Sequence, residues 1–211
     1  ASGGGHGIVP WQHEGGGRVP PGMYLQERMA GVAGSIVFAA DGTRAVPLGL
    51  SQGLAGERAF GARGFRYCGN ILARAGDAQF AADARLCAAA TALAAAVTEE
   101  FGLMGVNGID FIARRGIPYA LEVNPRYTAS MELVERAYGL SMFEIHARAC
   151  AGALPTFDLA GARAAPGAIG KATPASSIAV TNFLMILSST CIPDQGFGHH
   201  NPGLLFIIIH K

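Results

Sequence analysis

Two neighbouring segments in the middle of the chain constrain the fold most strongly. The first is GVNGIDFI at residues 105–112, and the second is PYALEVNPR at residues 118–126. Both alternate apolar and polar residues as half-buried strands do, and a short glycine-containing connection separates them. They predict an antiparallel hairpin with Asp110 opposite Glu122. Asn124 shares their face, because successive side chains of a strand alternate between its two faces.

The acidic face of this hairpin indicates a metal site. Four apolar side chains point to the opposite face, which we expect to lie in the core: Ile109, Phe111, Leu121 and Val123. Two carboxylates directly across a strand pair repel each other unless a cation lies between them. Mg²⁺ takes one or two carboxylates and completes its shell with water and phosphate oxygens, so this face also implies a nucleotide. Alternatively, Asp110 and Glu122 are solvated residues of an exposed sheet face, paired with Arg114 or Arg126.

Composition narrows the class of protein. Half of the 211 residues are hydrophobic and 15% are charged, which argues against a disordered chain or a coiled coil. A formal net charge of +1 provides no basic field for a phosphate backbone, so we do not expect a nucleic-acid partner. The four cysteines lack C-x-x-C spacing and no signal peptide is visible, so we expect a cytoplasmic protein. The chain lacks an initial Met, and we expect its true start upstream.

Strands are predicted before the hairpin. Residues 23–29 and 35–38 are typical of short strands of one antiparallel sheet, and the Asp41-Gly42 turn leads into a third strand over residues 44–50. Residues 50–70 are rich in Gly and Ala and keep no period, so we expect a mobile loop there.

Helices are predicted on both sides of the hairpin. An apolar repeat at spacings of three and four predicts a long helix capped by Asp77 and stopped by Gly102. A second helix covers residues 131–138, and a third begins at Ser141, where Ser141 and Glu144 match a capping box. This mixture of elements predicts an α+β fold in which antiparallel sheets pack against helices.

The composition changes near residue 171. Residues 1–170 contain fourteen Arg and no Lys, whereas both lysines lie beyond them. We therefore divide the chain into a domain at 1–170 and an atypical tail at 171–211, foreign or poorly ordered, with few contacts to the domain. The apolar run at about 178–192 is shorter than the roughly 20 residues of a membrane span. A buried strand, an interfacial segment and a reading-frame slip are the alternatives for it.

Taken in order, the motifs resemble those of the ATP-grasp superfamily of carboxylate–amine ligases. The resemblance spans residues 1–170 and includes SGGGHGI, YLQERMAG, FRYCGNI and, most specifically, GVNGIDFI with YALEVNPRYTASME. It is nearest to a branch of small cytoplasmic proteins with the E-V-N-P-R ending. The resemblance implies two α+β lobes that hold ATP between them.

The resemblance also implies roles for individual residues. A glycine-rich loop would cover the ATP phosphates: Gly3, Gly4, Gly5, His6 and Gly7. A hinge strand would meet the adenine edge: Gln26, Glu27, Arg28 and Met29. Asp110, Glu122 and Asn124 would bind Mg²⁺, with Mn²⁺ as the alternative ion, and Arg126 would face the transferred phosphoryl group. By itself the glycine run is more typical of a surface turn, since it matches no standard phosphate-binding motif. His6 by itself is more typical of a polar loop residue than of a catalytic residue.

The implied reaction joins a small-molecule carboxylate to an amine through an acyl phosphate, at the expense of ATP. A non-catalytic nucleotide-binding module and a kinase on the same fold are the alternatives, because a fold alone does not decide an activity. Relatives place a lysine shortly before the glycine loop and a further domain before that, and this chain contains neither. We therefore expect a fragment that holds the metal side of the site and part of the nucleotide side. Neither a membrane nor nucleic acid is expected as a partner.

Overall fold

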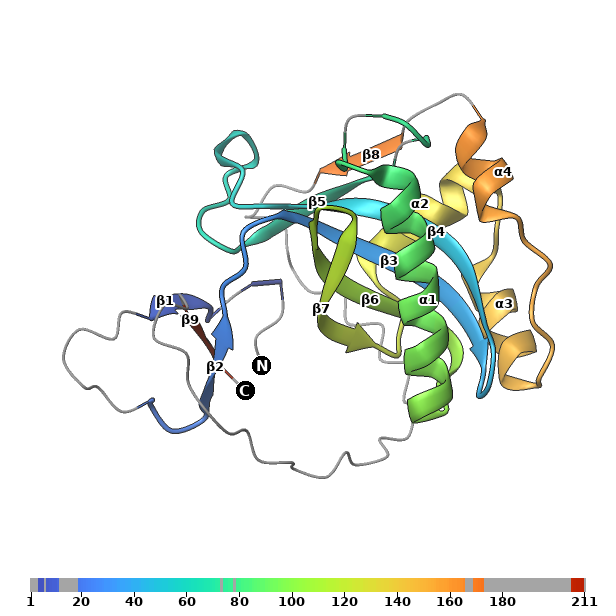
Figure 1. Cartoon of the computed structure of the whole chain (residues 1–211), viewed down its shortest axis with the longest axis horizontal. Coiled ribbons are helices and arrows are strands. Elements are labelled where there is room, and N and C mark those ends of the chain that lie inside the picture. Colours follow the sequence, from blue (N-terminus) through green and yellow to red (C-terminus); the bar gives the residue numbers. More distant parts are fainter. Residues whose placement is uncertain are drawn as a thin grey trace.

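The structure, a computed structural model, describes residues 4–5, 7–11, 19–72, 74–77 and 79–165, and the backbone of residues 169–172 and 206–210. Its main sheet has six strands: β3 (Val32–Asp41), β4 (Ala45–Ala55), β5 (Tyr67–Leu72), β6 (Met104–Arg114), β7 (Ile117–Asn124) and β8 (Ile169–Ala172). They lie in the order β7-β6-β3-β4-β5-β8, and every pair is antiparallel (Figure 1). A smaller sheet contains β1 (Val9–Trp11), β9 (Phe206–His210) and β2 (Met23–Glu27) in that order.

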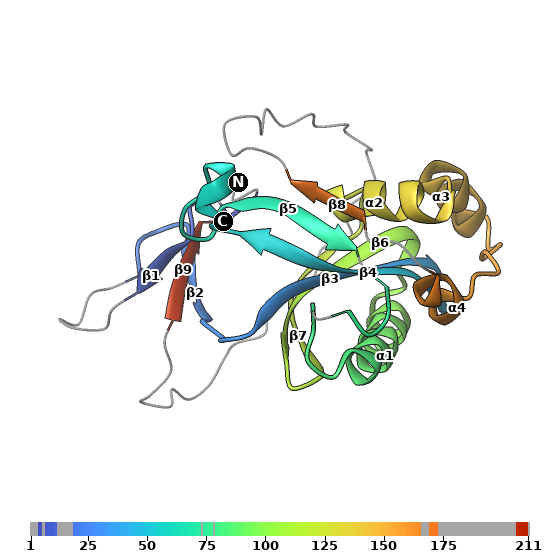
Figure 2. The same ribbon diagram turned by 90° about the horizontal axis from the view of Figure 1, so that it is seen from above.

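Helices cover both faces of the main sheet. They are α1 (Asp83–Phe101), α2 (Ala129–Tyr138), α3 (Met142–Cys150) and α4 (Leu159–Ala164). In Figure 2, α1 lies below the sheet and α2 and α3 lie above it. The side chains of β3 alternate accordingly. Ile36 and Phe38 lie in the core between the sheet and α1, and Val37 and Ala39 lie in the core between the sheet and α2 and α3. The predicted α+β fold with antiparallel sheets is confirmed.

Several predicted elements are confirmed at their ends. Chain reversal at Asp41-Gly42 joins β3 to β4, and the Asp41 carboxylate accepts hydrogen bonds from the backbone N–H groups of Thr43 and Arg44. Helix α1 ends at Gly102 and α2 at Gly139, both in the left-handed conformation. Helix α3 begins after Ser141, whose Oγ accepts from the Glu144 N–H at 3.3 Å. The Glu144 carboxylate pairs with Arg148 rather than with the backbone at Ser141, so the structure shows one of the two bonds of the predicted capping box.

The beginning of α1 differs from the prediction. The helix starts at Asp83 rather than after Asp77, which pairs with Arg74 in the preceding turn. Phe80 lies outside the helix and still reaches the core, where its ring centre is 6.4 Å from that of Phe111. The apolar repeat on which the prediction depends includes Phe80, a loop residue, so the predicted start of the helix is too early.

The predicted loop at residues 50–70 is wrong at both ends. Strand β4 continues to Ala55 and β5 begins at Tyr67, so only residues 56–66 connect them, with a short 3-10 helix at Arg58–Phe60. β4 is buried in its middle on both faces, so it lacks the alternation of a half-exposed strand. Its small residues serve packing: a Cβ on Gly49 would lie 2.3 Å from a methyl group of Val134 on α2.

Two further expectations are corrected by the sheet pairings. Strand β2 pairs with β9 and does not belong to the sheet of β3. The expectation of few contacts beyond residue 170 is wrong for β8, which pairs with β5, and for β9, which lies between β1 and β2. The apolar run at 178–192 lies outside the described residues, and the division of the chain at residue 170 stays a prediction. None of the described helices is both long and apolar enough to cross a bilayer.

Candidate metal and nucleotide site

The β6–β7 hairpin brings the three predicted metal ligands together. Asp110 lies directly opposite Glu122, and Asn124 lies opposite Gly108. The Asn124 amide nitrogen is 3.0 Å from Asp110 Oδ2 and 3.2 Å from Glu122 Oε1, so it donates a hydrogen bond to each carboxylate. The predicted hairpin and its register are therefore confirmed, whereas metal binding by these residues stays a prediction.

A β-bulge changes the apolar side of the hairpin. After the Asp110–Glu122 pair the register shifts, and Phe111 pairs with Ala120, which leaves Leu121 as the extra residue of β7. Phe111 is fully buried, but Leu121 is 42% and Val123 37% exposed. The expectation that both strands would place their apolar side chains in the core holds for β6 only, because β7 is the edge strand.

The electrostatics of the pair favour a cation. The pKa of Asp110 is raised from 3.8 to about 6, and burial of the carboxyl group is the largest cause. The negative charge of Glu122 raises the pKa further, while hydrogen bonds from Ser35 and Asn124 act in the opposite direction. A cation between the carboxylates would relieve the repulsion that the Asn124 amide relieves only in part.

The available ligands suit Mg²⁺ better than a soft metal. Among the described residues, no three His, Cys, Asp or Glu side chains are grouped closely enough to hold a metal ion by themselves. The oxygens at hand are those of Asp110 and Glu122, and the Asn124 oxygen if its amide turns over. Such a set leaves positions open for water and phosphate oxygens, as Mg²⁺ sites usually do.

The alternative of two solvated, arginine-paired carboxylates fits Asp110 poorly. Asp110 is only partly accessible, although Glu122 is exposed. Within the described residues, no ion pair joins Arg114 or Arg126 to either carboxylate. Arg126 is exposed after β7, and its Nη1 donates to the Tyr127 carbonyl oxygen at 3.3 Å.

A row of polar side chains extends from the carboxylates across the same face of the sheet. Asp110 is opposite Ser35 on β3, and Ser35 is opposite Ser51 on β4. Ser51 Oγ accepts from the Asn70 amide at 3.1 Å, and the Tyr67 hydroxyl donates to the oxygen of Asn70. Burial, and then the charge of Asp110, raise the pKa of Tyr67. This row went unrecognised in the sequence, where its only signal is the presence of Ser and Asn inside apolar strands.

The glycine-rich loop contacts the start of β5. The Gly4 carbonyl accepts from the Tyr67 N–H at 3.0 Å, and a Cβ on Gly5 would lie 1.9 Å from the Phe65 carbonyl oxygen. Gly5 and Gly7 both have φ of +77°, a region that favours glycine. Two predicted loop residues lie outside the described residues: Gly3 and His6. The described part of the loop therefore lies beside the FRYCGNI motif.

The predicted hinge is at the end of β2. Gln26 and Glu27 are its last two residues, and Arg28 and Met29 follow it. The Arg28 guanidinium carbon lies 6.0 Å from the centre of the Phe65 ring, within the range of a cation–π contact. Phe65 thus lies close to both the hinge and the glycine-rich loop.

The small sheet also approaches the carboxylates. Burial, followed by the negative charge of Glu122, raises the pKa of Tyr24 on β2. Tyr24 remains 45% exposed. The hinge side and the metal side of the predicted nucleotide site therefore lie near one another.

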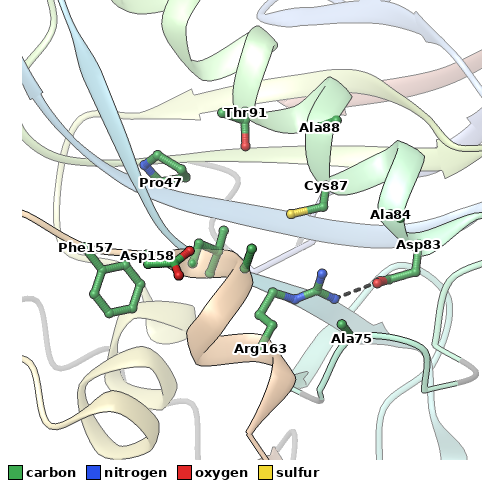
Figure 3. Close-up of a pocket in the computed structure, with 12 residues that line it drawn as sticks. Pro47, Ala75, Asp83, Ala84, Cys87, Ala88, Thr91, Phe157, Asp158 and Arg163 are labelled. Carbon is green, nitrogen blue, oxygen red and sulfur yellow. Dashed lines mark hydrogen bonds and ion pairs between the residues drawn. The ribbon is translucent and has the colours of Figure 1, made fainter.

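A cavity of about 620 Å³ lies elsewhere, between α1 and α4 (Figure 3). Arg163 on α4 reaches Asp83 on α1 at 2.7 Å, and both side chains are nearly buried. The other lining residues include Pro47, Cys87, Thr91, Phe157 and Leu159. This cavity is on the α1 face of the sheet, whereas Ser35 and Asp110 face α2, so it is separate from the carboxylates.

Comparisons with known proteins identify the family. No curated protein matches the chain. Among solved structures, an ATP-grasp superfamily protein from Archaeoglobus fulgidus is 27% identical, with a TM-score of 0.45, over 61% of this chain and 37% of that chain. The biotin carboxylase domain of a thermophilic 2-oxoglutarate carboxylase, bound to bicarbonate, is 18% identical, with a TM-score of 0.47, over 65% and 29%. The Kluyveromyces lactis urea carboxylase is 20% identical, with a TM-score of 0.43, over 67% and 11%.

The chain spans 37% or less of the length of these three structures. The family model described as an ATP-grasp domain matches residues 1–130, which is more than half of the chain. The matched residues include the glycine-rich loop, the hinge, the FRYCGNI motif and the β6–β7 hairpin. This chain therefore belongs to the ATP-grasp family.

Proposed function

We propose that this chain is part of an ATP- and Mg²⁺-dependent ligase that joins a carboxylate to an amine through an acyl-phosphate intermediate. Membership of the ATP-grasp family supports the use of ATP. The observation that carries the proposal is the cross-strand pair of Asp110 and Glu122 with the Asn124 amide between them. Such a pair is poorly suited to a purely structural role, because the two charges repel each other on a partly buried surface.

Asp110, Glu122 and Asn124 would hold the metal ion. When bound, Mg²⁺ neutralises phosphate charge and so favours attack on the terminal phosphorus. Asp110 would be a fixed ligand, because its carboxylate already accepts hydrogen bonds from two neighbours. Glu122, on the exposed edge strand, has more freedom to adjust its carboxylate to a nucleotide.

Other parts of the chain would bind and orient the anionic substrates. The exposed guanidinium of Arg126 follows β7 by two residues and can present two N–H groups to a phosphoryl or carboxylate group. Gly4, Gly5 and Gly7 can bring backbone N–H groups close to phosphate oxygens because they carry no Cβ. Gln26 to Met29, at the edge of the small sheet, would meet the adenine base.

Product analysis tests the proposal. The purified protein is incubated with Mg²⁺, ATP, the proteinogenic amino acids and small primary amines, and the products are identified by mass spectrometry. A ligase yields ADP, inorganic phosphate and a new compound with the mass of an acid plus an amine less water. ADP with a stable phosphorylated product would instead indicate a kinase, and tight ATP binding without any ADP would indicate a non-catalytic module.

A further inference from the structure

Three hydroxyl groups connect the beginning of α2 with Asp110. Ser35 lies opposite Asp110 in the β3–β6 pair, and hydrogen bonding from its side chain acts to lower the pKa of Asp110. Ser35 Oγ is 3.5 Å from Ser130 Oγ, and Ser130 Oγ is 2.9 Å from Thr128 Oγ1. Ser35 is 3% and Ser130 4% exposed, so water has little access to these two hydroxyls.

The direction of each hydrogen bond follows from the number of protons available. An ionised carboxylate only accepts, and a serine hydroxyl has one proton to donate. Ser35 therefore donates to Asp110 and must accept from Ser130. Ser130 has then used its own proton and must accept from Thr128. All three contacts then point toward the carboxylate, and the Ser35–Ser130 contact, at 3.5 Å, is the weakest of those with a known length.

We propose that Ser35 and Ser130 are positioning residues, which hold the Asp110 carboxylate in place for the metal ion through this series of hydrogen bonds. The inference rests on the metal site proposed above. Ser35 on β3 and Ser130 on α2 would thus affect metal affinity although neither contacts the ion.

The hydroxyl groups connect two segments of the chain that carry metal ligands. Asp110 lies on β6, whereas Glu122 and Asn124 lie on β7, which leads through Arg126 into α2. The hydroxyls cross from the N-terminal cap of α2 to β3 and from β3 to β6. They therefore join the segment that carries Asp110 to the segment that carries the other ligands. Asn124 fixes one oxygen of Asp110 at 3.0 Å, and Ser35 supplies a second hydrogen bond to the same carboxylate.

Binding of Mn²⁺ in the presence of ATP, measured by electron paramagnetic resonance at pH 8, tests the proposal. Removing a group that orients a metal ligand typically weakens metal affinity by 10–100-fold. We expect Ser35→Ala to weaken Mn²⁺ binding about tenfold. Ser130→Ala should have a smaller effect, about threefold, because Ser35 still donates to the carboxylate in that variant.

The double variant distinguishes a series from two separate contributions. Once Ser35 is removed, Ser130 has no link to Asp110, so Ser35→Ala/Ser130→Ala should bind Mn²⁺ no more weakly than Ser35→Ala. Thr98→Ala is the control. Thr98 is a buried residue of α1, on the other face of the sheet, and loss of its hydroxyl should change Mn²⁺ affinity by less than about twofold.

Each outcome decides between the two proposals. Wild-type protein that binds no Mn²⁺ with ATP would overturn the proposed metal site, and the positioning role with it. If the wild type binds Mn²⁺ and Ser35→Ala binds it with equal affinity, the positioning role alone is overturned. The positioning role is also overturned if the affinity losses of the two single variants multiply in the double variant. If Ser35→Ala fails to fold, Ser35→Cys keeps the packing but is a weak donor, and it should show the same tenfold loss.

Discussion

The raised pKa of Asp110 predicts that Asp110→Asn will stabilise the metal-free protein at neutral and alkaline pH. A carboxyl group with a higher pKa in the folded state than in the unfolded chain binds its proton more tightly when folded. Its contribution to stability is present below about pH 4 and is lost as the pH rises through about 6. Asparagine has a similar shape and carries no charge, so the variant escapes this loss.

The magnitude follows from the two pKa values. A rise from 3.8 to about 6 corresponds to about 3 kcal/mol, at about 1.4 kcal/mol for each tenfold change in the ionisation equilibrium. Asp110 is partly accessible and interacts strongly with Glu122, so a gain of about 2 kcal/mol at pH 8 is expected for Asp110→Asn. At pH 4 the carboxyl group of the wild type is largely protonated, and the two proteins should differ by less than about 1 kcal/mol.

Urea unfolding without divalent metal, at intervals from pH 4 to pH 8, measures this difference. The free energies of unfolding of the two proteins should diverge as the pH passes through 5 and 6. Adding Mg²⁺ with ATP at pH 8 should stabilise the wild type and leave the variant unchanged, because ligands that bind only the folded state stabilise it. A difference between the two proteins that stays constant from pH 4 to pH 8 would refute the assigned cause.

Three other substitutions, one of them with a control variant, give contrasting expectations. Arg126→Lys should lower the rate of ADP release by at least about tenfold, because lysine keeps the charge but loses the planar fork that holds two oxygens; an unchanged rate would remove Arg126 from the site. Gly5→Ala should weaken ATP binding in equilibrium dialysis, because its Cβ would meet the Phe65 carbonyl. Gly61→Ala is its control, having positive φ and open space, and should bind ATP normally. Glu144→Gln should cost at most about 1 kcal/mol in thermal unfolding and leave ADP release unchanged, since the Glu144 backbone N–H, which the substitution keeps, makes the bond to the cap.

The sequence predicted the hairpin correctly because its information is local. Alternation along β7 predicts that Glu122 and Asn124 share a face, and the short turn predicts that the two strands pair. The bulge after Asp110, which brings Glu122 rather than Leu121 opposite Asp110, depends on how β7 accommodates the edge of the sheet. A residue-by-residue pattern carries no signal for it.

The missed features depend on contacts between distant parts of the chain. The polar row brings Ser35, Ser51 and Asn70 into line with Asp110 only because β6 pairs on one edge with β3, a strand far from it in sequence. β4 was predicted to end too early because burial on both faces removes its alternation. The clash that fixes Gly5 arises from the Phe65 backbone sixty residues away.

Isothermal titration of ATP into the protein in the presence of Mg²⁺, with wild type and Glu122→Gln compared, tests the central claim most directly. The substitution keeps the shape of the side chain and removes one charged ligand. Mg²⁺-dependent ATP binding by the wild type, with a loss of at least about tenfold in Glu122→Gln and unchanged thermal stability, is the predicted result. Equal Mg²⁺-dependent affinity in both proteins would contradict the assignment of Asp110, Glu122 and Asn124 as the metal site.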